Sequence, residues 1–137
     1  MQKVYHSDSL SLKLIRSDIK DFLSKHQVDD VDAGYIIIAL NEACMNIIQH
    51  ANDGQYDGDI VVNVTLLDDS VSIEIIDQAR TVKANKLIGR DITNIEPGGL
   101  GIHLMKDIMD TVEYSSIDNN QGNRLLMTKK IGFYNEI

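Results

Sequence analysis

Two runs of alternating apolar residues constrain the fold of this 137-residue chain more than any other feature. Residues 60–67 and 71–77 are rich in valine and isoleucine, which recur at every second position, and the short stretch Asp68, Asp69 and Ser70 joins them. This pattern predicts a β-hairpin, because β-branched residues favour strands and the joining residues favour a turn. The alternation places the apolar side chains on one face, so other elements have to cover that face.

Three segments have the spacing of amphipathic helices. Residues 10–25 place apolar side chains three and four positions apart, and Ser9 or Ser11 can cap this helix. The same spacing predicts helices over residues 31–51 and 100–109. Such helices bury one stripe of side chains, so each is expected to pack on a sheet or on another helix.

A second pair of predicted strands, residues 111–117 and 124–131, follows the last helix, and a weaker strand pattern covers residues 3–6. Strands joined by short loops pair in the antiparallel direction. We therefore expect an α/β two-layer sandwich (α+β), with about three helices on one face of a largely antiparallel or mixed sheet of four to five strands. The length suits a single domain over residues 1–137, in which residues 78–97 show neither period and are a candidate lid.

Charge and cysteine content exclude several classes of function. The 13 Lys and Arg residues against 21 Asp and Glu residues give a net charge of -8, which disfavours direct binding of nucleic acid or of anionic membranes. The single cysteine, Cys44, cannot form an internal disulfide, and the first residues lack the apolar core of a signal peptide. The longest apolar run, residues 35–40, is far shorter than the ~20 residues that cross a bilayer. These features predict a cytoplasmic protein without a membrane-spanning segment.

The second predicted helix carries a polar stripe with two possible interpretations. Asn46 and Gln49 lie within about 40° of Glu42 around the helix axis, opposite the aliphatic arc. The stripe is either a solvated face or a covered polar site, and the apolar Tyr35, Ile38 and Met45 on the same side favour a covered one. Glutamate and asparagine one turn apart offer two oxygen ligands that suit Mg²⁺ and its waters.

Two further segments carry candidate binding groups. Asp77 ends an apolar strand, where its carboxylate either accepts hydrogen bonds at the sheet rim or starts a turn. Gly98 and Gly99 lead into the helix predicted from Leu100, in which Gly101 follows, and backbone N–H groups at a glycine-rich helix start bind phosphate well. A plain glycine turn before a helix is the structural alternative.

Taken together, these segments resemble one family. Residues 39–51, which read ALNEACMNIIQHA, resemble the N-box of the GHKL (Bergerat-fold) ATPases, and more narrowly the pattern N-E-A-x-x-N-x-x-x-H-A of the bacterial anti-sigma-factor serine/threonine kinases. Residues 97–105, which read PGGLGIHLM, and residues 109–114 after them resemble the second glycine box and the following strand of that family. The likeness extends over almost the whole chain.

The resemblance implies a nucleotide site with specific roles. Asn46 would coordinate the Mg²⁺ ion that accompanies ATP, Glu42 would act as the base or orient the attacking hydroxyl, and Asp77 would accept the adenine amino hydrogen. Backbone N–H groups at the helix start would bind the phosphates, at Gly99, Leu100, Gly101 and Ile102. Phosphoryl transfer depends mainly on positioning and charge neutralisation, so this set of groups would suffice.

The resemblance also implies a function. Proteins of this group are anti-sigma regulatory factors that use ATP and Mg²⁺ to phosphorylate a serine or threonine of a STAS-type anti-anti-sigma protein. They sequester a sigma factor when that antagonist is phosphorylated. Related kinases are commonly homodimers, which is also the commonest symmetric assembly.

Two parts of the implied adenine site differ from the family pattern. Ala79 and Thr81 stand where the first glycine box has glycines, and Asn123 stands where the family has threonine. Alanine is compatible with a backbone φ below zero and strained at a φ above zero. Asn123 can replace the threonine as both donor and acceptor. The alternative function is therefore a Bergerat-fold protein-binding module with weak or no kinase activity.

Overall fold

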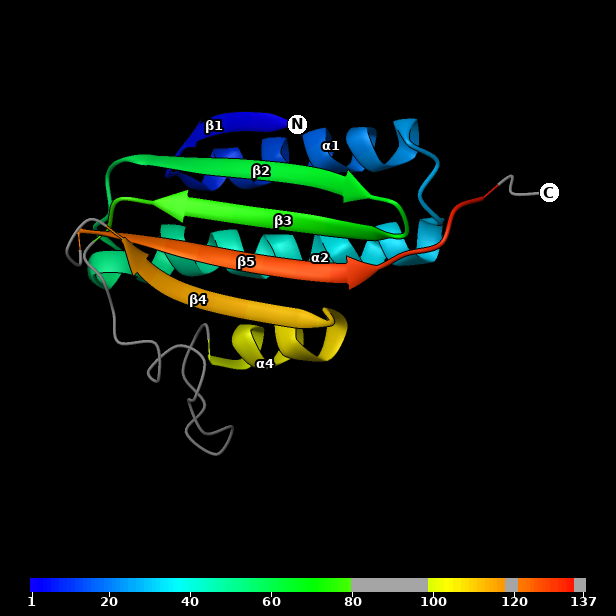
Figure 1. Cartoon of the computed structure of the whole chain (residues 1–137). Coiled ribbons are helices and arrows are strands. Elements are labelled where there is room, and N and C mark those ends of the chain that lie inside the picture. Colours follow the sequence, from blue (N-terminus) through cyan, green and yellow to red (C-terminus); the bar gives the residue numbers. More distant parts are fainter. Residues whose placement is uncertain (80–98, 118–120, 135–137) are drawn as a thin grey trace.

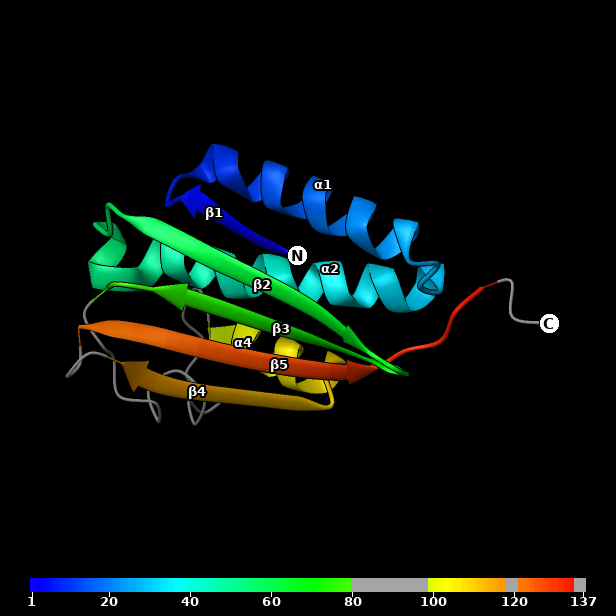
Figure 2. The ribbon, with the colours of Figure 1, turned by 45° about the horizontal axis from the view of Figure 1, so that its top comes forward.

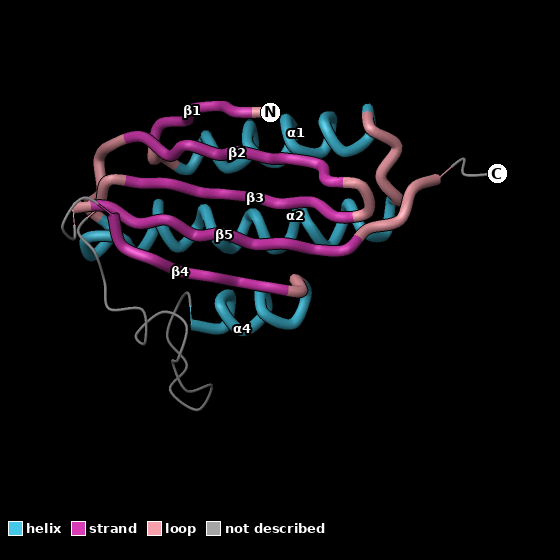
Figure 3. The backbone as a smooth tube through the Cα atoms, in the orientation of Figure 1, coloured by secondary structure: helices cyan, strands magenta, loops and turns pink. Residues whose placement is uncertain are grey.

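Residues 1–79, 99–117 and 121–134 are described by the computed structural model, and they build a sheet with helices on one face (Figure 1). The strands are β1 (Gln2–His6), β2 (Asp59–Leu67), β3 (Ser70–Asp77), β4 (Thr111–Ile117) and β5 (Gly122–Lys130). The helices are α1 (Ser9–Lys25), α2 (Asp30–Met45) and α4 (Gly99–Ile108), and Figure 3 shows them in one layer. The two-layer sandwich expected from the sequence is confirmed.

Neighbouring strands of the sheet all run antiparallel, in the order β1-β2-β3-β5-β4. The strand that comes last in sequence, β5, lies between β3 and β4, and its register sets Asn123 opposite Asp77 of β3. These two residues are 46 positions apart in the chain. Figure 2 shows the helices behind the sheet, with α2 between α1 and α4 and packed against both.

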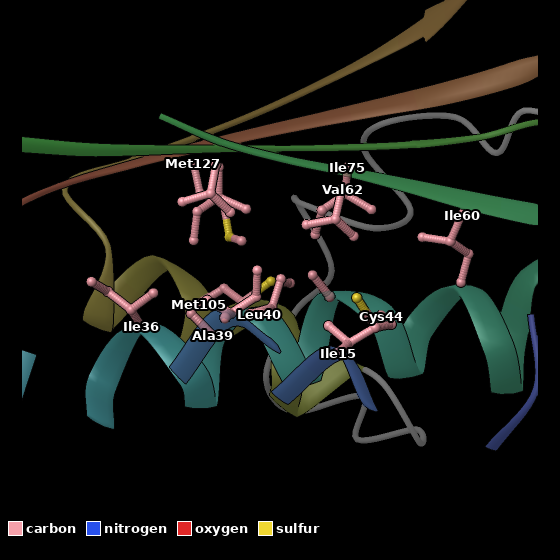
Figure 4. Packing of buried hydrophobic residues seen from close by; sticks show 14 of the residues in the cluster. Ile15, Ile36, Ala39, Leu40, Cys44, Ile60, Val62, Ile75, Met105 and Met127 are labelled. Carbon is pink, nitrogen blue, oxygen red and sulfur yellow. The ribbon is translucent and has the colours of Figure 1, made fainter. Parts of the chain in front are cut away.

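The core lies between the sheet and the helices. Val62 of β2 and Ile75 of β3 point towards Leu40 and Cys44 of α2 (Figure 4), and all four side chains are almost completely buried. Removing each large aliphatic side chain from water contributes about 1.5–3 kcal/mol to folding. This packing fixes α2 under the middle of the sheet and so positions the polar residues at its C-terminal end.

The helix α2 is rich in apolar residues, and part of them belong to this core. By length and composition alone, the helical segment Asp30–Gln49 could cross a membrane, a test that the core helix of a soluble protein also passes. In the structure Ile36, Leu40 and Cys44 are fully buried in the core. Burial in the core accounts for these residues, whereas Val31, Tyr35 and Ile38 of the same helix are exposed.

Aspartates, not serines, cap the first two helices. The predicted caps Ser9 and Ser11 are wrong, because the side chain of Asp8 accepts a hydrogen bond from the backbone N–H of Ser11 at 3.0 Å. Asp29 caps α2 in the same way. An ionised carboxylate both accepts this bond and interacts favourably with the positive end of the helix dipole.

The regular helix predicted over residues 31–51 ends early, at Met45. From Asn46 the chain widens into a π-helix (Asn46–His50), in which the N–H of Ala51 donates to the carbonyl oxygen of Asn46, and a short 3-10 helix (Ala51–Gly54) follows. Counting positions at 100° per residue assumes an α-helix, so it does not hold beyond Asn46. Such π-helices are rare, and those that occur are often found at functional sites.

Candidate functional site

Asp77 ends β3 as a buried carboxylate held by two donors. The residue is 4% exposed, and its Oδ1 accepts hydrogen bonds from Asn123 Nδ2 at 2.9 Å and from the Ala79 backbone N–H at 2.8 Å. The same Asn123 amide donates to the carbonyl oxygen of Ala79 at 3.1 Å. Because both bonds to the carboxylate end on Oδ1, they fix the direction in which Oδ2 points.

Burial changes the acidity of this carboxyl group. Desolvation raises the pKa of Asp77 above its ordinary value of 3.8, while the hydrogen bonds from Asn123 and Ala79 oppose that rise. An ionised carboxylate is purely an acceptor, and its hydrogen bonds are stronger in a low-dielectric environment than in water. Asp77 is therefore suited to bind a donor group such as an amino group.

Ala79 fits next to Asp77 without backbone strain. Within the described part of the chain, the non-glycine residues with a positive φ are Gln27 and Asp68, so Ala79 has an ordinary backbone conformation. Its side chain is fully buried, and both its N–H and its carbonyl oxygen are hydrogen-bonded. The glycine expected from the family pattern is thus not required here for its conformational freedom.

Tyr56, which the sequence analysis did not identify, holds the segment after Asp77 from another side. Its hydroxyl accepts a hydrogen bond from the backbone N–H of Gln78 at 3.0 Å and donates one to the carbonyl oxygen of Asp59 at 2.7 Å. A Cβ at Gly58 would come within 2.7 Å of this hydroxyl. Loop residues have no periodicity, so the sequence contains no signal for a role that depends on how this loop folds back onto β3.

Glu42 and Asn46 lie at the C-terminal end of α2. The backbone N–H of Asn46 donates to the carbonyl oxygen of Glu42, and both residues are partly buried. Asn46 Nδ2 is buried and has no hydrogen-bond partner among the residues that the structure describes. An unpaired buried amide costs folding free energy, so this side chain suits a site in which a polar ligand completes its hydrogen bonds.

The apolar side chains beside Glu42 on α2 are exposed. Tyr35 is 48% exposed and Ile38 is 43% exposed. The expectation that this side of the helix is covered is wrong for both residues, because the sheet covers only one face of α2 and the neighbouring helices lie at its flanks (Figure 2).

The predicted phosphate-binding residues form the first turn of α4. This turn contains Gly99, Leu100, Gly101 and Ile102, and α4 packs against α2. At the other end of α4, Lys129 Nζ donates to the carbonyl oxygen of Ile108 at 3.1 Å, which stabilises the negative end of the helix dipole. The predicted lid, residues 78–97, lies outside the described residues from position 80 onward.

The structure brings the predicted site residues together in two groups. Asp77, Ala79 and Asn123 form one hydrogen-bonded group at the rim of the sheet. Glu42 lies in the last turn of α2, and Asn46 follows that turn as the C-cap residue. Among the described residues, no group of three or more His, Cys, Asp or Glu side chains could hold a metal ion. A cavity that joins the two groups to the first turn of α4 stays a prediction.

Comparisons with known proteins identify the family. Residues 6–129 match the model of the histidine kinase-like ATPase domain. The chain is 28% identical over 109 residues to the serine-protein kinase RsbW of Bacillus velezensis, an alignment that covers 74% of this chain and 65% of that protein. It is 31% identical over 102 residues to RsbW of Bacillus cereus, which covers 69% of this chain and 61% of the relative. The chain thus spans less than two thirds of the length of these curated relatives.

Solved structures have the same fold. A structure of the RsbU and RsbW domains of a Mycobacterium tuberculosis protein superposes with a TM-score of 0.72 at 17% identity, over 97% of this chain and 32% of that one. The mycobacterial sensor histidine kinase MprB superposes with a TM-score of 0.58 at 10% identity, over 97% and 99% of the two chains. Since the family model matches most of the chain and the fold agrees, the chain belongs to the histidine kinase-like ATPase domain family, the GHKL ATPases.

Proposed function

We propose that the chain is an anti-sigma regulatory factor that acts as an ATP-dependent protein serine/threonine kinase. The observation that carries the proposal is the buried carboxylate of Asp77, held by Asn123 and Ala79 at the position where the family pattern has the adenine acceptor. The relatives named serine-protein kinase RsbW, at 28% and 31% identity, support the kinase activity.

The residues present fit a nucleotide that carries a magnesium ion. Asn46 Nδ2 is buried without a partner among the described residues, so an acceptor oxygen of a bound phosphate or water would complete its hydrogen bonds. The oxygen of the same amide is of the type that Mg²⁺ binds. When bound, Mg²⁺ supplies neutralisation of the charge on the phosphates.

In the proposed reaction each group has one task. Asp77 accepts a hydrogen bond from the adenine amino group and so orients the base. The N–H groups in the first turn of α4 bind phosphate oxygens, assisted by the helix dipole. Glu42 accepts the proton of the attacking serine or threonine hydroxyl, or orients that hydroxyl, and Asn46 is the proposed metal ligand.

The proposed protein substrate is a STAS-type anti-anti-sigma protein, and the sequestered partner is a sigma factor. Both assignments rest on the resemblance to the anti-sigma kinases. We further propose that the protein is a cytoplasmic homodimer with no direct contact to nucleic acid, in keeping with its net charge of -8.

Labelled ATP provides the direct test. The purified chain is incubated with labelled ATP, Mg²⁺ and a STAS-type protein from the same genomic neighbourhood, and label on serine or threonine is measured. We expect Mg²⁺-dependent transfer, together with a thermal midpoint that rises with ATP concentration as expected for a ligand of the folded state. The absence of any thermal shift at millimolar ATP would refute the nucleotide site.

A binding module without efficient kinase activity is the second candidate. The fully buried methyl group of Ala79, which fills space beside Asp77 where a glycine would leave room, is the observation that favours it. A module of this kind would bind its protein partner but show neither label transfer nor a thermal shift with ATP. The labelled-ATP experiment therefore separates the two candidates.

Asn46→Ala is expected to weaken the magnesium-dependent part of nucleotide binding. The substitution removes the proposed metal ligand, so the gain in ATP affinity on adding Mg²⁺ should fall about tenfold. It also removes a buried amide without a partner among the described residues, so the protein without nucleotide should be no less stable. Calorimetry with and without Mg²⁺, together with thermal unfolding, measures both effects.

Asn63→Ala is the matched control, because Asn63 donates to Glu74 within the sheet, on β2. This variant should respond to Mg²⁺ like the unaltered protein. A full magnesium response in Asn46→Ala would contradict the assignment of Asn46 as the metal ligand.

A further inference from the structure

Tyr114 extends the hydrogen-bonded group around Asp77 by one residue. Its hydroxyl donates to Asn123 Oδ1 from the neighbouring strand β4. We propose that Tyr114 is a positioning residue for adenine recognition: it orients the Asn123 amide, which in turn orients Asp77, so that Asn123 acts through Asp77 and not on the base. This inference rests on the proposed nucleotide site and assigns a role to a tyrosine for which the resemblance implied none.

The amide of Asn123 has no donor hydrogen left for a ligand. One Nδ2 hydrogen is directed to Asp77 Oδ1 at 2.9 Å and the other to the carbonyl oxygen of Ala79 at 3.1 Å. A primary amide has two such hydrogens, and both are used within the protein. Because Asn123 is also buried, at 8% exposed, its contribution to base recognition is to hold Asp77 and Ala79 in place.

Together with Asp77 and Ala79, the Tyr114 hydroxyl fixes which way this amide faces. An amide turned by 180° would set its oxygen against two other acceptors, the Asp77 carboxylate and the Ala79 carbonyl. In the observed orientation the amide oxygen faces the tyrosine hydroxyl, which donates to it. Hydrogen bonds in a chain polarise and strengthen one another in a low-dielectric environment. The chain of donors runs from Tyr114 through Asn123 and ends on the carboxylate of Asp77.

The backbone makes this contact possible. The register of β4 and β5 pairs Tyr114 with Leu125, so Asn123 is its diagonal neighbour on the same face, within reach of a tyrosine side chain. Gly122 allows β5 to lie close to the end of β3, since a Cβ there would come within 2.8 Å of the Asp77 carbonyl oxygen. A larger residue at 122 would move Asn123 away from Asp77.

A pair of nucleotides tests the proposed role. Inosine triphosphate carries an oxygen in place of the adenine amino group, so it lacks the donor that Asp77 accepts. We expect Tyr114→Phe to lower the affinity for ATP about fivefold and to leave the affinity for inosine triphosphate unchanged. A merely structural role would lower both affinities alike, and that result would overturn the proposal.

Tyr134→Phe is the matched control. This substitution also removes a tyrosine hydroxyl, which here donates to the Ser24 carbonyl oxygen at 3.1 Å. Tyr134 follows the C-terminal end of β5, whereas Asn123 lies at its N-terminal end. This variant should keep both affinities. An equal loss of ATP affinity in the two variants would show that the effect does not depend on the contact with Asn123.

A double-mutant cycle tests the route through Asn123. In the Asn123→Thr background, the side chain at position 123 has a hydroxyl and no amide for Tyr114 to orient. Tyr114→Phe should therefore cause no further change in the preference for ATP over inosine triphosphate in this background. The same reduction in both backgrounds would show that Tyr114 does not act through Asn123, and the proposal would be wrong.

The outcomes also separate this inference from the proposed function. If the unaltered protein binds no ATP, both are overturned. If it prefers ATP and Tyr114→Phe keeps the full preference, only the inference fails. Should Tyr114→Phe not fold, ¹⁵N NMR of the unaltered protein provides the test. The side-chain amide hydrogens of Asn123, which are both hydrogen-bonded, should exchange slowly with water. Fast exchange of these hydrogens overturns the inference.

Discussion

Replacing Glu42 with glutamine is expected to reduce phosphate transfer about a hundredfold or more while ATP binding stays nearly intact. Glutamine keeps the shape of the side chain, but its amide cannot take up the proton of the attacking hydroxyl. The backbone carbonyl of Glu42 still accepts from the Asn46 N–H, so this helical turn remains. Single-turnover transfer of labelled phosphate measures the rate, and calorimetry measures the affinity.

Glu113→Gln is the matched control, because Glu113 is exposed on β4. It should alter neither the rate nor the affinity. An unchanged transfer rate in Glu42→Gln would remove Glu42 from the mechanism. A parallel loss of binding and transfer would instead assign Glu42 to nucleotide binding.

Asp77→Asn is expected to separate ATP binding from folding stability. Asparagine keeps an oxygen that accepts from Asn123 and Ala79, but its amide NH₂ replaces the second oxygen, which is proposed to accept from adenine. We expect the ATP affinity to fall about thirtyfold to a hundredfold, since a hydrogen bond to a charged group contributes ~1.5–3 kcal/mol. The protein without nucleotide should keep or raise its thermal midpoint at neutral pH, because a buried charge has been removed.

The raised pKa of Asp77 sets the pH dependence of both effects. The folded-state pKa of Asp77 lies above its ordinary value of 3.8. The contribution of this group to the stability of the fold is therefore fully present below pH 3.8 and is lost as the pH rises through the raised pKa. The stability gain of Asp77→Asn should therefore be present at neutral pH and vanish in acid. ATP binding by the unaltered protein should weaken as the pH falls through the same raised pKa.

Thermal unfolding and calorimetry across this pH range provide the measurement. Asp21→Asn, at an exposed position on α1, is the control and should follow the unaltered protein at every pH. A variant Asp77→Asn that is less stable than the unaltered protein at neutral pH would show that the charge of Asp77 stabilises the fold.

The sheet and the helices could be predicted because their patterns are local. The alternation over residues 60–67 and 71–77 does not fit the spacing of a helix. The observed strands, Asp59–Leu67 and Ser70–Asp77, each begin one residue before the predicted range. The last helix is displaced by one residue, to Gly99–Ile108. Burial of one face determines these elements, and side-chain periodicity records that burial directly.

The site depends on features that periodicity does not record. The π-helix that begins at Asn46 has a different number of residues per turn from an α-helix. Placing residues around the helix axis from the sequence assumes that this number is constant. The contacts of Asn123 with Asp77 and Tyr114 require the register of three strands, which the sequence of any one strand does not contain. The backbone of Ala79 could be judged only once its φ angle was known.

The place of β5 inside the sheet has a consequence for synthesis of the protein. It is made after β1 to β4, so a growing chain exposes the open edge of β3 until β5 has left the ribosome and docked. Open strand edges pair readily with other chains, which makes this interval the period of greatest aggregation risk. Before it ends, the nascent protein has Asp77 but not Asn123 beside it, so the proposed nucleotide site is incomplete until β5 has docked.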